Sequence, residues 1–303
     1  MIHGINNNYL YAVSHAHVSF TNASGEGVES SGTGFFVVKD RQLYFITNRH
    51  VIDIASQDAK YAGYALDSIR FDVRKYDEKS KNVVAKTYEV GLYRLLLPDN
   101  DLDDIACISH MKLIGENVNL KNAFPFELLA DSECLEKQMS VCDSVAIIGF
   151  PSVYDHLNDL PVLRAGVISS DPRLDYSYNH SFIGHVIAYE AFSTDGASGS
   201  PVIALQKGFP VGEGLSASDD FFRPVKIIGV NAGFIIEFEQ ENKQKEEKKE
   251  EQEEEKKEEK GVHQHMSYMY KSDVIRKLIL QAEQSKTPEY VNRKLVCPVK
   301  GYR

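Results

Sequence analysis

The chain has 303 residues, of which 43% are hydrophobic and 10% aromatic, so it can bury one large core or two ordinary ones. Its formal net charge of -10, with no stripe of clustered lysines and arginines, argues against a nucleic-acid partner. No run approaches the roughly 18 apolar residues of a membrane span, and the first residues (MIHGINNNYLYAV) lack a basic start, so we expect no membrane partner, no secretory signal and a cytoplasmic location.

The first 115 residues carry the alternating pattern of short β-strands joined by turns. A turn is predicted at 22–27, and a hairpin is predicted around Lys39, Asp40 and Arg41. The strands predicted in this part are residues 9–20, 34–38, 42–47, 92–97 and 104–108.

The remaining sequence continues the pattern of short strands and has few helix signals, which indicates a sandwich or a barrel. The best helix signal covers 272–284, where Ser272 is expected to be the N-cap and the apolar residues share one face. The strands predicted here are residues 144–149, 162–168, 183–189, 201–205 and 225–231.

Residues 240–260 are compositionally different from the rest of the chain. They contain ten Glu and seven Lys in 21 positions and no apolar residue, so they cannot bury surface. The segment falls between two strand-like stretches, 225–236 and 265–270, and we interpret it as an expanded hairpin tip. An inert solvated loop and a docking or regulatory segment both remain open.

The cysteines and histidines show no metal-binding pattern in the sequence. No Cys-x-x-Cys pair or Cys/His cluster has zinc spacing, so we expect reduced cysteines and no metal. His263 and His265 border the charged segment, and we favour a solvent-facing pair over a small metal site there. The cysteines are Cys107, Cys134, Cys142 and Cys297.

The stretch DGASGSPVI, residues 195–203, places Ser198 in a small-residue turn directly before a strand. A serine hydroxyl becomes a nucleophile only with an adjacent base, a group that orients the base, and donors for the oxyanion. Gly196 and Gly199 allow a tight bend that aims the amides of Gly196 and Ser198 at one point. The turn can therefore supply an oxyanion hole.

His50 is the best candidate for the base. Two predicted strands lead into the segment ITNRHV, so His50 follows the end of the second strand on a fixed scaffold. The orienting acid is expected in LDDIACI, where Asp104 heads a strand and shares a side with Ala106. Asp103 points to the other face and is the less favoured choice.

Three motifs, GTGFFV…ITNRHV, DDIACI and DGASGSPVI, occur in the order His, Asp, Ser. This arrangement resembles the chymotrypsin-like (trypsin-like) serine peptidases, whose triad follows that chain order. The segment IIGFPSVYDHLNDLPVLRAGVIS is similar to the Gly-x-Pro…Arg-x-Gly-x-Ile-Ser segment of their bacterial branch, and IIGVNAG is similar to the strand that lines the substrate cleft. The resemblance covers residues 10–284 apart from the charged segment.

The resemblance implies an all-β fold of two six-stranded antiparallel β-barrels with a C-terminal helix. His50 and Asp104 would come from the first barrel and Ser198 from the second. The implied organisation is an N-terminal barrel, a C-terminal barrel, a charged insert, a last strand with the helix, and a tail, at residues 1–118, 119–235, 236–261, 262–284 and 285–303.

The resemblance also implies a serine endopeptidase that acts on a protein or peptide substrate through an acyl-enzyme, without a metal or other cofactor. Phe192 stands where trypsin-like members carry an acid at the base of the primary pocket, which disfavours cleavage after Arg or Lys. Ala232 and Gly233 would face the substrate. Ala197 replaces the acid that pairs with a newly cut N-terminus in digestive members, so activation by trimming is not expected.

Two other functions compete with the peptidase. One is a catalytically silent or partner-gated peptide-binding protein on the same fold, and a regulatory protein partner is a hypothesis in either case. The other is an α/β-hydrolase esterase, which needs Gly-x-Ser-x-Gly on a strand-to-helix elbow. Here Ser200 takes the last position, Pro201 follows, and a strand comes next, so the esterase is disfavoured.

Overall fold

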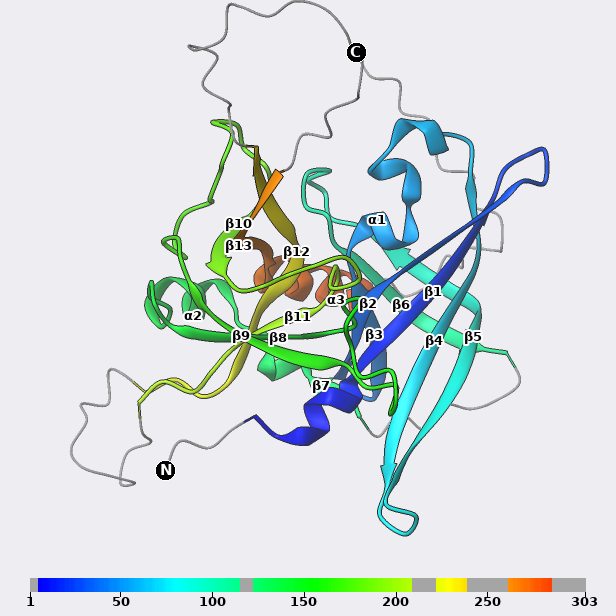
Figure 1. Ribbon diagram of the computed structural model, residues 1–303, viewed down its shortest axis with the longest axis horizontal. Coiled ribbons are helices and arrows are strands. Elements are labelled where there is room, and N and C mark those ends of the chain that lie inside the picture. Colours follow the sequence, from blue (N-terminus) through cyan, green and yellow to red (C-terminus); the bar gives the residue numbers. More distant parts are fainter. Residues whose placement is uncertain (1–4, 115–121, 209–221, 239–260, 285–303) are drawn as a thin grey trace, which may run out of the picture.

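The computed structural model describes residues 5–114, 122–208, 222–238 and 261–284 (Figure 1). After a 3₁₀ helix at Asn7–Ala12, the first half forms antiparallel strands. These are β1 (Val13–Thr21), β2 (Gly27–Lys39), β3 (Gln42–Thr47), β4 (Ala65–Asp77), β5 (Asn82–Leu96) and β6 (Ala106–Leu113).

These six strands close into a barrel. Their order is β1-β4-β5-β6-β3-β2, and β2 pairs with β1 to complete the ring. The two-residue strand β7 (Phe124–Pro125) adds in parallel to β2. Aromatic side chains fill part of the interior: Phe36 and Phe71 contact Phe45 with ring centroids 5.1 and 4.1 Å away. Burying each such ring stabilises the fold by about 2–3 kcal/mol.

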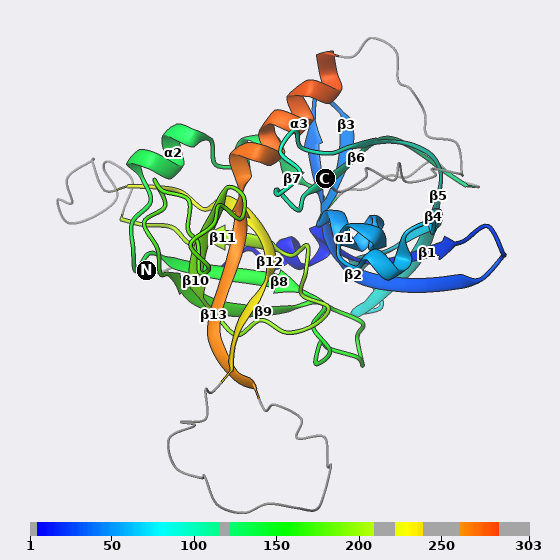
Figure 2. The same cartoon turned by 90° about the horizontal axis from the view of Figure 1, so that it is seen from above.

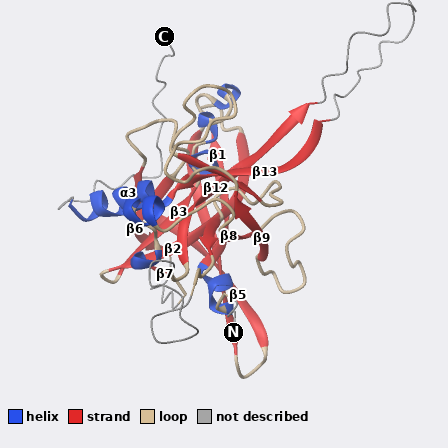
Figure 3. Ribbon diagram, turned by 90° about the vertical axis from the view of Figure 1, so that its left-hand side faces the viewer, coloured by secondary structure: helices blue, strands red, loops and turns tan. Residues whose placement is uncertain are grey.

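The second half forms a second closed barrel, of order β10-β13-β12-β11-β8-β9, in which every strand pair is antiparallel (Figures 1 and 3). Its strands are β8 (Ser144–Gly149), β9 (Val162–Ile168), β10 (Val186–Glu190), β11 (Pro201–Ala204), β12 (Lys226–Phe238) and β13 (Gly261–Lys271).

The helices are few and lie outside the barrels. They are α1 (Arg49–Ile52), α2 (Ser132–Lys137), α3 (Ser272–Gln284) and three further 3₁₀ turns at Ile54–Ser56, Ala59–Tyr61 and Phe126–Leu128. Helix α3 contacts β12 and β13 of the second barrel and β6 of the first (Figure 2). Within the described ranges no helix has the length and apolar character of a membrane span.

The expected fold class, two six-stranded antiparallel barrels with a C-terminal helix, is confirmed. The hairpin around Asp40 and Arg41 is also confirmed: both residues have positive φ (48° and 67°), and Lys39 pairs with Gln42, as in a two-residue turn. The strand expected at 9–20 is correct only from Val13 onward, because the residues before it form the 3₁₀ helix.

One strand was missed, one is longer than expected, and one helix cap is wrong. Strand β4 was not predicted, and the strand expected at 92–97 is the end of the longer β5. Ser272 is the first residue of α3 rather than its N-cap, and its hydroxyl donates to the carbonyl oxygen of Ala130 at 2.7 Å. This bond ties the start of the helix to the segment that precedes α2.

The expected insert at 236–261 lies mostly outside the described residues. Strands β12 and β13 pair as far as Phe238 and Gly261, so its two ends belong to one antiparallel ribbon. The side chains of His263 and His265, and the whole of Cys297, are also outside the described residues. Cys107 and Cys134 are buried and unpaired. A third free cysteine, Cys142, is exposed.

The two barrels are joined beside β1 and β4 by a buried arginine. The Arg74 side chain has 0% exposure, and its guanidinium lies 4.5 Å from the ring centroid of Phe150, which follows β8. Its Nη2 donates to Asp159 Oδ2 at 2.6 Å. The ring of His15 stacks on the same Phe150, with centroids 5.1 Å apart.

We expect the burial of His15 against Phe150 to make the free energy of unfolding decrease at acidic pH. Burial is the largest cause that lowers the pKa of His15 from 6.5 to about 4. Between these values the unfolded chain binds a proton at His15 that the folded chain does not bind, so stability falls as pH falls, by at most roughly 3 kcal/mol. Urea unfolding between pH 7 and 4.5 should show a flatter pH dependence for His15→Gln.

The matched control is His180→Asn, at an exposed histidine with positive φ, 62°, that asparagine tolerates. This variant should keep the pH dependence of the unchanged protein. Equal slopes for His15→Gln and the unchanged protein would show that His15 is not the group responsible.

Candidate active site

His50 lies in α1, the single helical turn that directly follows β3. Its position after a buried strand agrees with the expectation from the sequence. Asn48 precedes the turn, and its side-chain Nδ2 donates to the backbone carbonyl of Asp104 at 2.7 Å. Residues of two loops, one after β3 and one before β6, are thereby held together.

Asp104 accepts two hydrogen bonds from His50. The backbone N–H of His50 donates to Oδ1 at 2.9 Å, and Nδ1 of the ring lies 2.6 Å from Oδ2. The side chains are only 17% and 26% exposed. Two contacts from one carboxylate fix both the position and the orientation of the imidazole, with Nδ1 toward the acid. Among the described residues, no group bonds to His50 Nε2.

Asp103 forms a separate pair with His185, as expected from its opposite direction. His185 donates from its backbone N–H to Asp103 Oδ1 at 2.7 Å, and its Nδ1 lies 2.8 Å from Oδ2. Asp103 is 2% exposed. His185 precedes β10, so this pair connects the two barrels next to Asp104.

Ser198 lies in a turn between β10 and β11, as the sequence predicts. Gly196 and Gly199 have φ of 85° and 86°, in the left-handed region that glycine adopts without strain. A Cβ on Gly199 would also meet the carbonyl oxygen of Thr33 at 1.9 Å. Both glycines are therefore required by the shape of the turn, and Gly199 also by its close contact with the first barrel.

The turn presents the two backbone donors expected of an oxyanion hole. Within the described part of the chain, the N–H groups of Gly196 and Ser198 donate to no protein acceptor. The neighbouring N–H groups are used: Ala197 donates to Thr194 O at 3.1 Å, and Gly199 donates to Asn231 O at 3.0 Å. An anion bound at the turn would find two unused donors.

A buried polar group supports the turn from beneath. Asn231 Nδ2 donates to Ala197 O at 2.8 Å and to Ser193 Oγ at 3.2 Å. The Tyr189 hydroxyl donates to Asn231 Oδ1 at 2.6 Å. Burial raises the pKa of Tyr189, which keeps this phenol protonated and able to donate. The network holds the backbone at Ala197, where the acid of digestive family members is absent.

Thr33 of β2 holds the same turn from the first barrel. Its N–H donates to Ser198 O at 2.9 Å, and its Oγ1 donates to Gly196 O at 2.7 Å. The same Oγ1 accepts from the N–H of Phe150 at 3.0 Å. A Cβ built on Gly32 would meet Val51 Cγ2 at 2.8 Å and Ser198 O at 3.5 Å, so the serine turn lies beside α1.

The structure thus pairs His50 with Asp104 and places the Ser198 turn near α1, where the barrels meet. The Ser198 hydroxyl donates to Ala232 O at 3.5 Å, and among the described residues it makes no hydrogen bond with His50. Ala232 is buried beside the serine, and a Cβ on Gly233 would meet no atom within 4 Å, so space is open there.

Phe192 is 44% exposed, which excludes a core position for it. The guanidinium of Arg164 lies 5.0 Å from the ring centroid, and Arg164 Nη1 donates to Phe192 O at 2.8 Å. Burial lowers the pKa of Arg164. The segment that precedes the serine turn is therefore held from β9.

We expect Thr33→Val to loosen the serine turn without unfolding the protein. Valine keeps the shape but leaves Phe150 N–H and Gly196 O without their buried partner, at a cost of about 1–3 kcal/mol each. Chemical unfolding should show this loss, and kcat should fall more than KM changes. Thr21→Val, at the far end of β1, is the control. An unchanged kcat in a destabilised Thr33→Val would contradict a role in positioning the turn.

Several residues of the site were not singled out from the sequence. Asn48 lies within ITNRHV and Thr33 within GTGFF, so both stand inside recognised motifs. Asn231 is a polar residue in the apolar strand IIGVN, which is a signal for a buried hydrogen bond. The partnership of Asp103 with His185 spans 82 residues and has no local signal.

Comparisons with known proteins identify a family for the chain. The family described as trypsin-like peptidase domain matches residues 32–212, more than half of the chain. Among solved structures, one described as the HtrA-type protease AlgW with decapeptide is similar, with a TM-score of 0.46 and 16% identity. The alignment covers 92% of this chain and 65% of that one, so the chain spans less than two thirds of its length. Among curated proteins there is no match.

Proposed function

The chain belongs to the trypsin-like peptidase family, and on that basis we propose that it is a serine endopeptidase with Ser198 as nucleophile, His50 as base and Asp104 as orienting acid. One observation carries the proposal: His50 is bonded twice to Asp104, at 2.9 and 2.6 Å, next to a serine turn that has unused amides. Asp103 and His185 make the same two contacts, so it is the serine turn beside the His50–Asp104 pair that supports a catalytic role.

In the proposed reaction, Ser198 Oγ attacks the carbonyl carbon of a peptide bond while His50 Nε2 takes the hydroxyl proton. The positive charge on the ring is stabilised by ionised Asp104 at 2.6 Å from Nδ1. His50 then gives its proton to the leaving amine, which leaves an acyl group on Ser198. Water activated by His50 hydrolyses the ester and restores the enzyme.

The oxyanion of each tetrahedral intermediate would be bound by the N–H groups of Gly196 and Ser198. Each such donor contributes about 3 kcal/mol to transition-state stabilisation. The proposal is supported by the positive φ of Gly196, 85°, and by the network that fixes Ala197 O from below. Because the Asn231 network holds this backbone, the proposed oxyanion hole does not need the ion pair with a new N-terminus that digestive members use.

The substrate would lie as an extended strand along Ala232 and Gly233 of β12. An added strand makes main-chain hydrogen bonds, and the open space beside Gly233 admits a second backbone. Phe192 would contact the side chain that precedes the cleaved bond. The absence of an acid at this position supports a small or apolar side chain rather than Arg or Lys.

A second candidate is a peptide-binding protein on the same fold that a partner activates. It is favoured by the bond from Ser198 Oγ to Ala232 O, which uses the hydroxyl proton that an activated serine would donate to His50. Under this proposal, a cytoplasmic partner or the substrate itself would reorient the serine. If the purified chain alone degraded casein freely, partner gating would be excluded.

A fluorophosphonate probe separates the two candidates. It reacts with a serine that is already activated, so a working site should be labelled at Ser198 and identified by mass spectrometry of the modified peptide. Folded protein that stays unlabelled, yet binds peptides, would favour the second candidate. A peptide-library digest with the labelled and unlabelled forms would then define the cleavage preference.

A further inference from the structure

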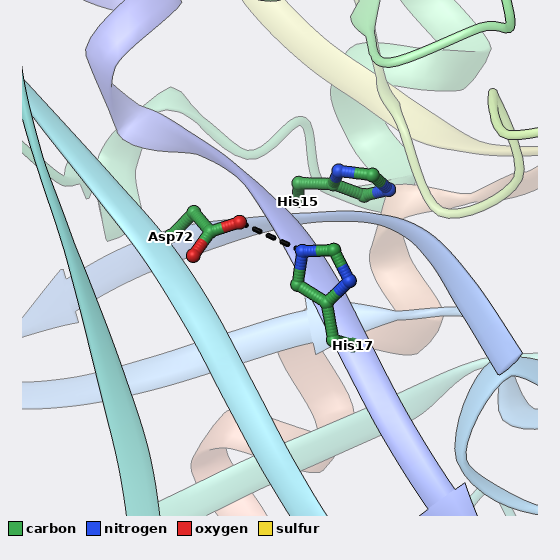
Figure 4. A group of neighbouring side chains, drawn as sticks. All are labelled: His15, His17 and Asp72. Carbon is green, nitrogen blue, oxygen red and sulfur yellow. Dashed lines mark hydrogen bonds and ion pairs between the residues drawn. The ribbon is translucent and has the colours of Figure 1, made fainter. Parts of the chain in front are cut away.

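A cluster of two histidines and an aspartate lies on the first barrel, apart from the proposed triad (Figure 4). His15 and His17 are two residues apart on β1 and point to the same face. Strand β4 pairs with β1 and places Asp72 opposite His15. One ligand atom from each residue lies within 4.8 Å of the others, and His17 Nε2 is 2.7 Å from Asp72 Oδ2.

The imidazole of His15 is held ready to act as a ligand. Its ring packs between Phe150 and Tyr154, at centroid distances of 5.1 and 5.9 Å, and lies 4.3 Å from the ring of His17. Within the described residues, neither ring nitrogen of His15 has a hydrogen bond, and the residue is half-buried.

Asp72 is also prepared for a cation. Thr87 Oγ1 donates to Asp72 Oδ1 at 2.7 Å, which fixes the carboxylate and leaves Oδ2 facing the histidines. Burial raises the pKa of Asp72, but the hydrogen bonds from His17 and Thr87 outweigh it and hold the pKa at about 2. A second hydrogen bond of this kind is a usual feature of metal-ligating carboxylates.

The surrounding charges leave the cluster with an excess of negative charge. Arg74 Nη2 lies 3.9 Å from Asp72 Oδ2, which opposes a cation, but the same atom is paired more closely with Asp159 at 2.6 Å. Around the cluster, the two carboxylates of Asp72 and Asp159 face the one guanidinium of Arg74. The site is also reachable, because the side chains of His17 and Asp72 are 37% and 17% exposed.

We propose that His15, His17 and Asp72 bind one Zn²⁺ ion, with water as the fourth ligand. Two imidazoles and a carboxylate are a common zinc ligand set. Ligand atoms about 2.1 Å from a tetrahedral zinc lie roughly 3.4 Å from one another. For zinc to bind, the 2.7 Å distance between His17 Nε2 and Asp72 Oδ2 must lengthen, and the largest distance among the three ligand atoms, at most 4.8 Å, must shorten. Side-chain rotation on the paired strands β1 and β4 allows both changes. The proposal does not depend on the peptidase activity.

The test is a zinc titration of the untagged, chelator-treated full chain by calorimetry, with Co²⁺ as a spectroscopic substitute. The unchanged protein should bind one more ion than His17→Gln or Asp72→Asn, and saturation with Zn²⁺ should raise its melting temperature by about 5 °C at a hundredfold excess over Kd. Either substitution should weaken binding at this site by about a hundredfold or more. His180→Asn is the matched control and should bind zinc like the unchanged protein.

A second measurement observes the histidine rings directly. In protein labelled with ¹⁵N-histidine, zinc should shift the imidazole nitrogens of two rings that lie close to one another, assigned to His15 and His17. The comparison with His17→Gln separates this site from zinc held by the His50–Asp104 pair. Equal stoichiometry in the unchanged protein and both site variants, or histidine signals at 15 and 17 that zinc leaves in place, would overturn the proposal.

Discussion

Ser198→Ala should lower kcat by about 10⁴-fold or more while the folded structure and peptide binding are retained. The hydroxyl is the only atom removed, and its one hydrogen bond is the long contact of 3.5 Å to Ala232 O, so little stability is lost. The chemical step, in contrast, loses its nucleophile, and the oxyanion donors alone retain only a small part of the acceleration. Hydrolysis of a fluorogenic peptide selected from the library digest measures the effect.

Two comparisons make this experiment specific. Fluorophosphonate labelling should disappear in Ser198→Ala, whereas Ser200→Ala, two residues away on a buried hydroxyl, should keep the label if it folds. A circular dichroism spectrum and a melting curve verify the fold of each variant. Peptide hydrolysis that survives in Ser198→Ala at the level of the unchanged protein would remove the serine from the mechanism.

Asp104→Asn should reduce kcat by about 10⁴-fold with a small change in KM. The asparagine can still accept from the His50 N–H at Oδ1, but an amide nitrogen would face Nδ1 at the 2.6 Å contact. The ring must then accept at Nδ1 and carry its proton on Nε2, which is the wrong tautomer for a base. Steady-state kinetics at neutral pH gives the two constants.

Asp103→Asn is a closely matched control, because the neighbouring carboxylate makes the same two contacts with His185. The change should lower the free energy of unfolding by about 1–3 kcal/mol, since Asp103 is buried. Its kcat should stay within about threefold of the unchanged protein. If the two variants lose activity equally, the assignment of Asp104 as the orienting acid is wrong.

The fold was predictable where a short, mostly apolar run lies between turn residues. Strands β8 and β9 match the expected 144–149 and 162–168, because their apolar runs are bounded by turn residues. Strand β4 could not be recognised in the same way. Its segment ALDSIRFDVRKYD alternates imperfectly, since a register shift against β1 interrupts the pairing and many of its side chains face solvent.

The candidate site was predictable in its residue types and only partly in its contacts. The order of the motifs indicated His50, Asp104 and Ser198, and the structure pairs the first two. The rotamer of Ser198 cannot be predicted from sequence patterns, because its hydroxyl donates to the carbonyl oxygen of Ala232, 34 residues away along the chain. The same reason explains why the cluster around His15 was missed. Asp72 joins His15 and His17 only because β4 pairs with β1, and β4 was not predicted.

The bonds of Thr33 have a consequence for how the molecule can be divided. The turn that carries Ser198 belongs to the second barrel, but its carbonyl groups are held by a residue of the first. Neither barrel therefore contains a finished active centre, although each closes its own sheet. If the proposed peptidase activity is correct, two fragments separated between β6 and β8 would each be inert, and hydrolysis would return only when they reassociate, so the fold is suited to fragment complementation.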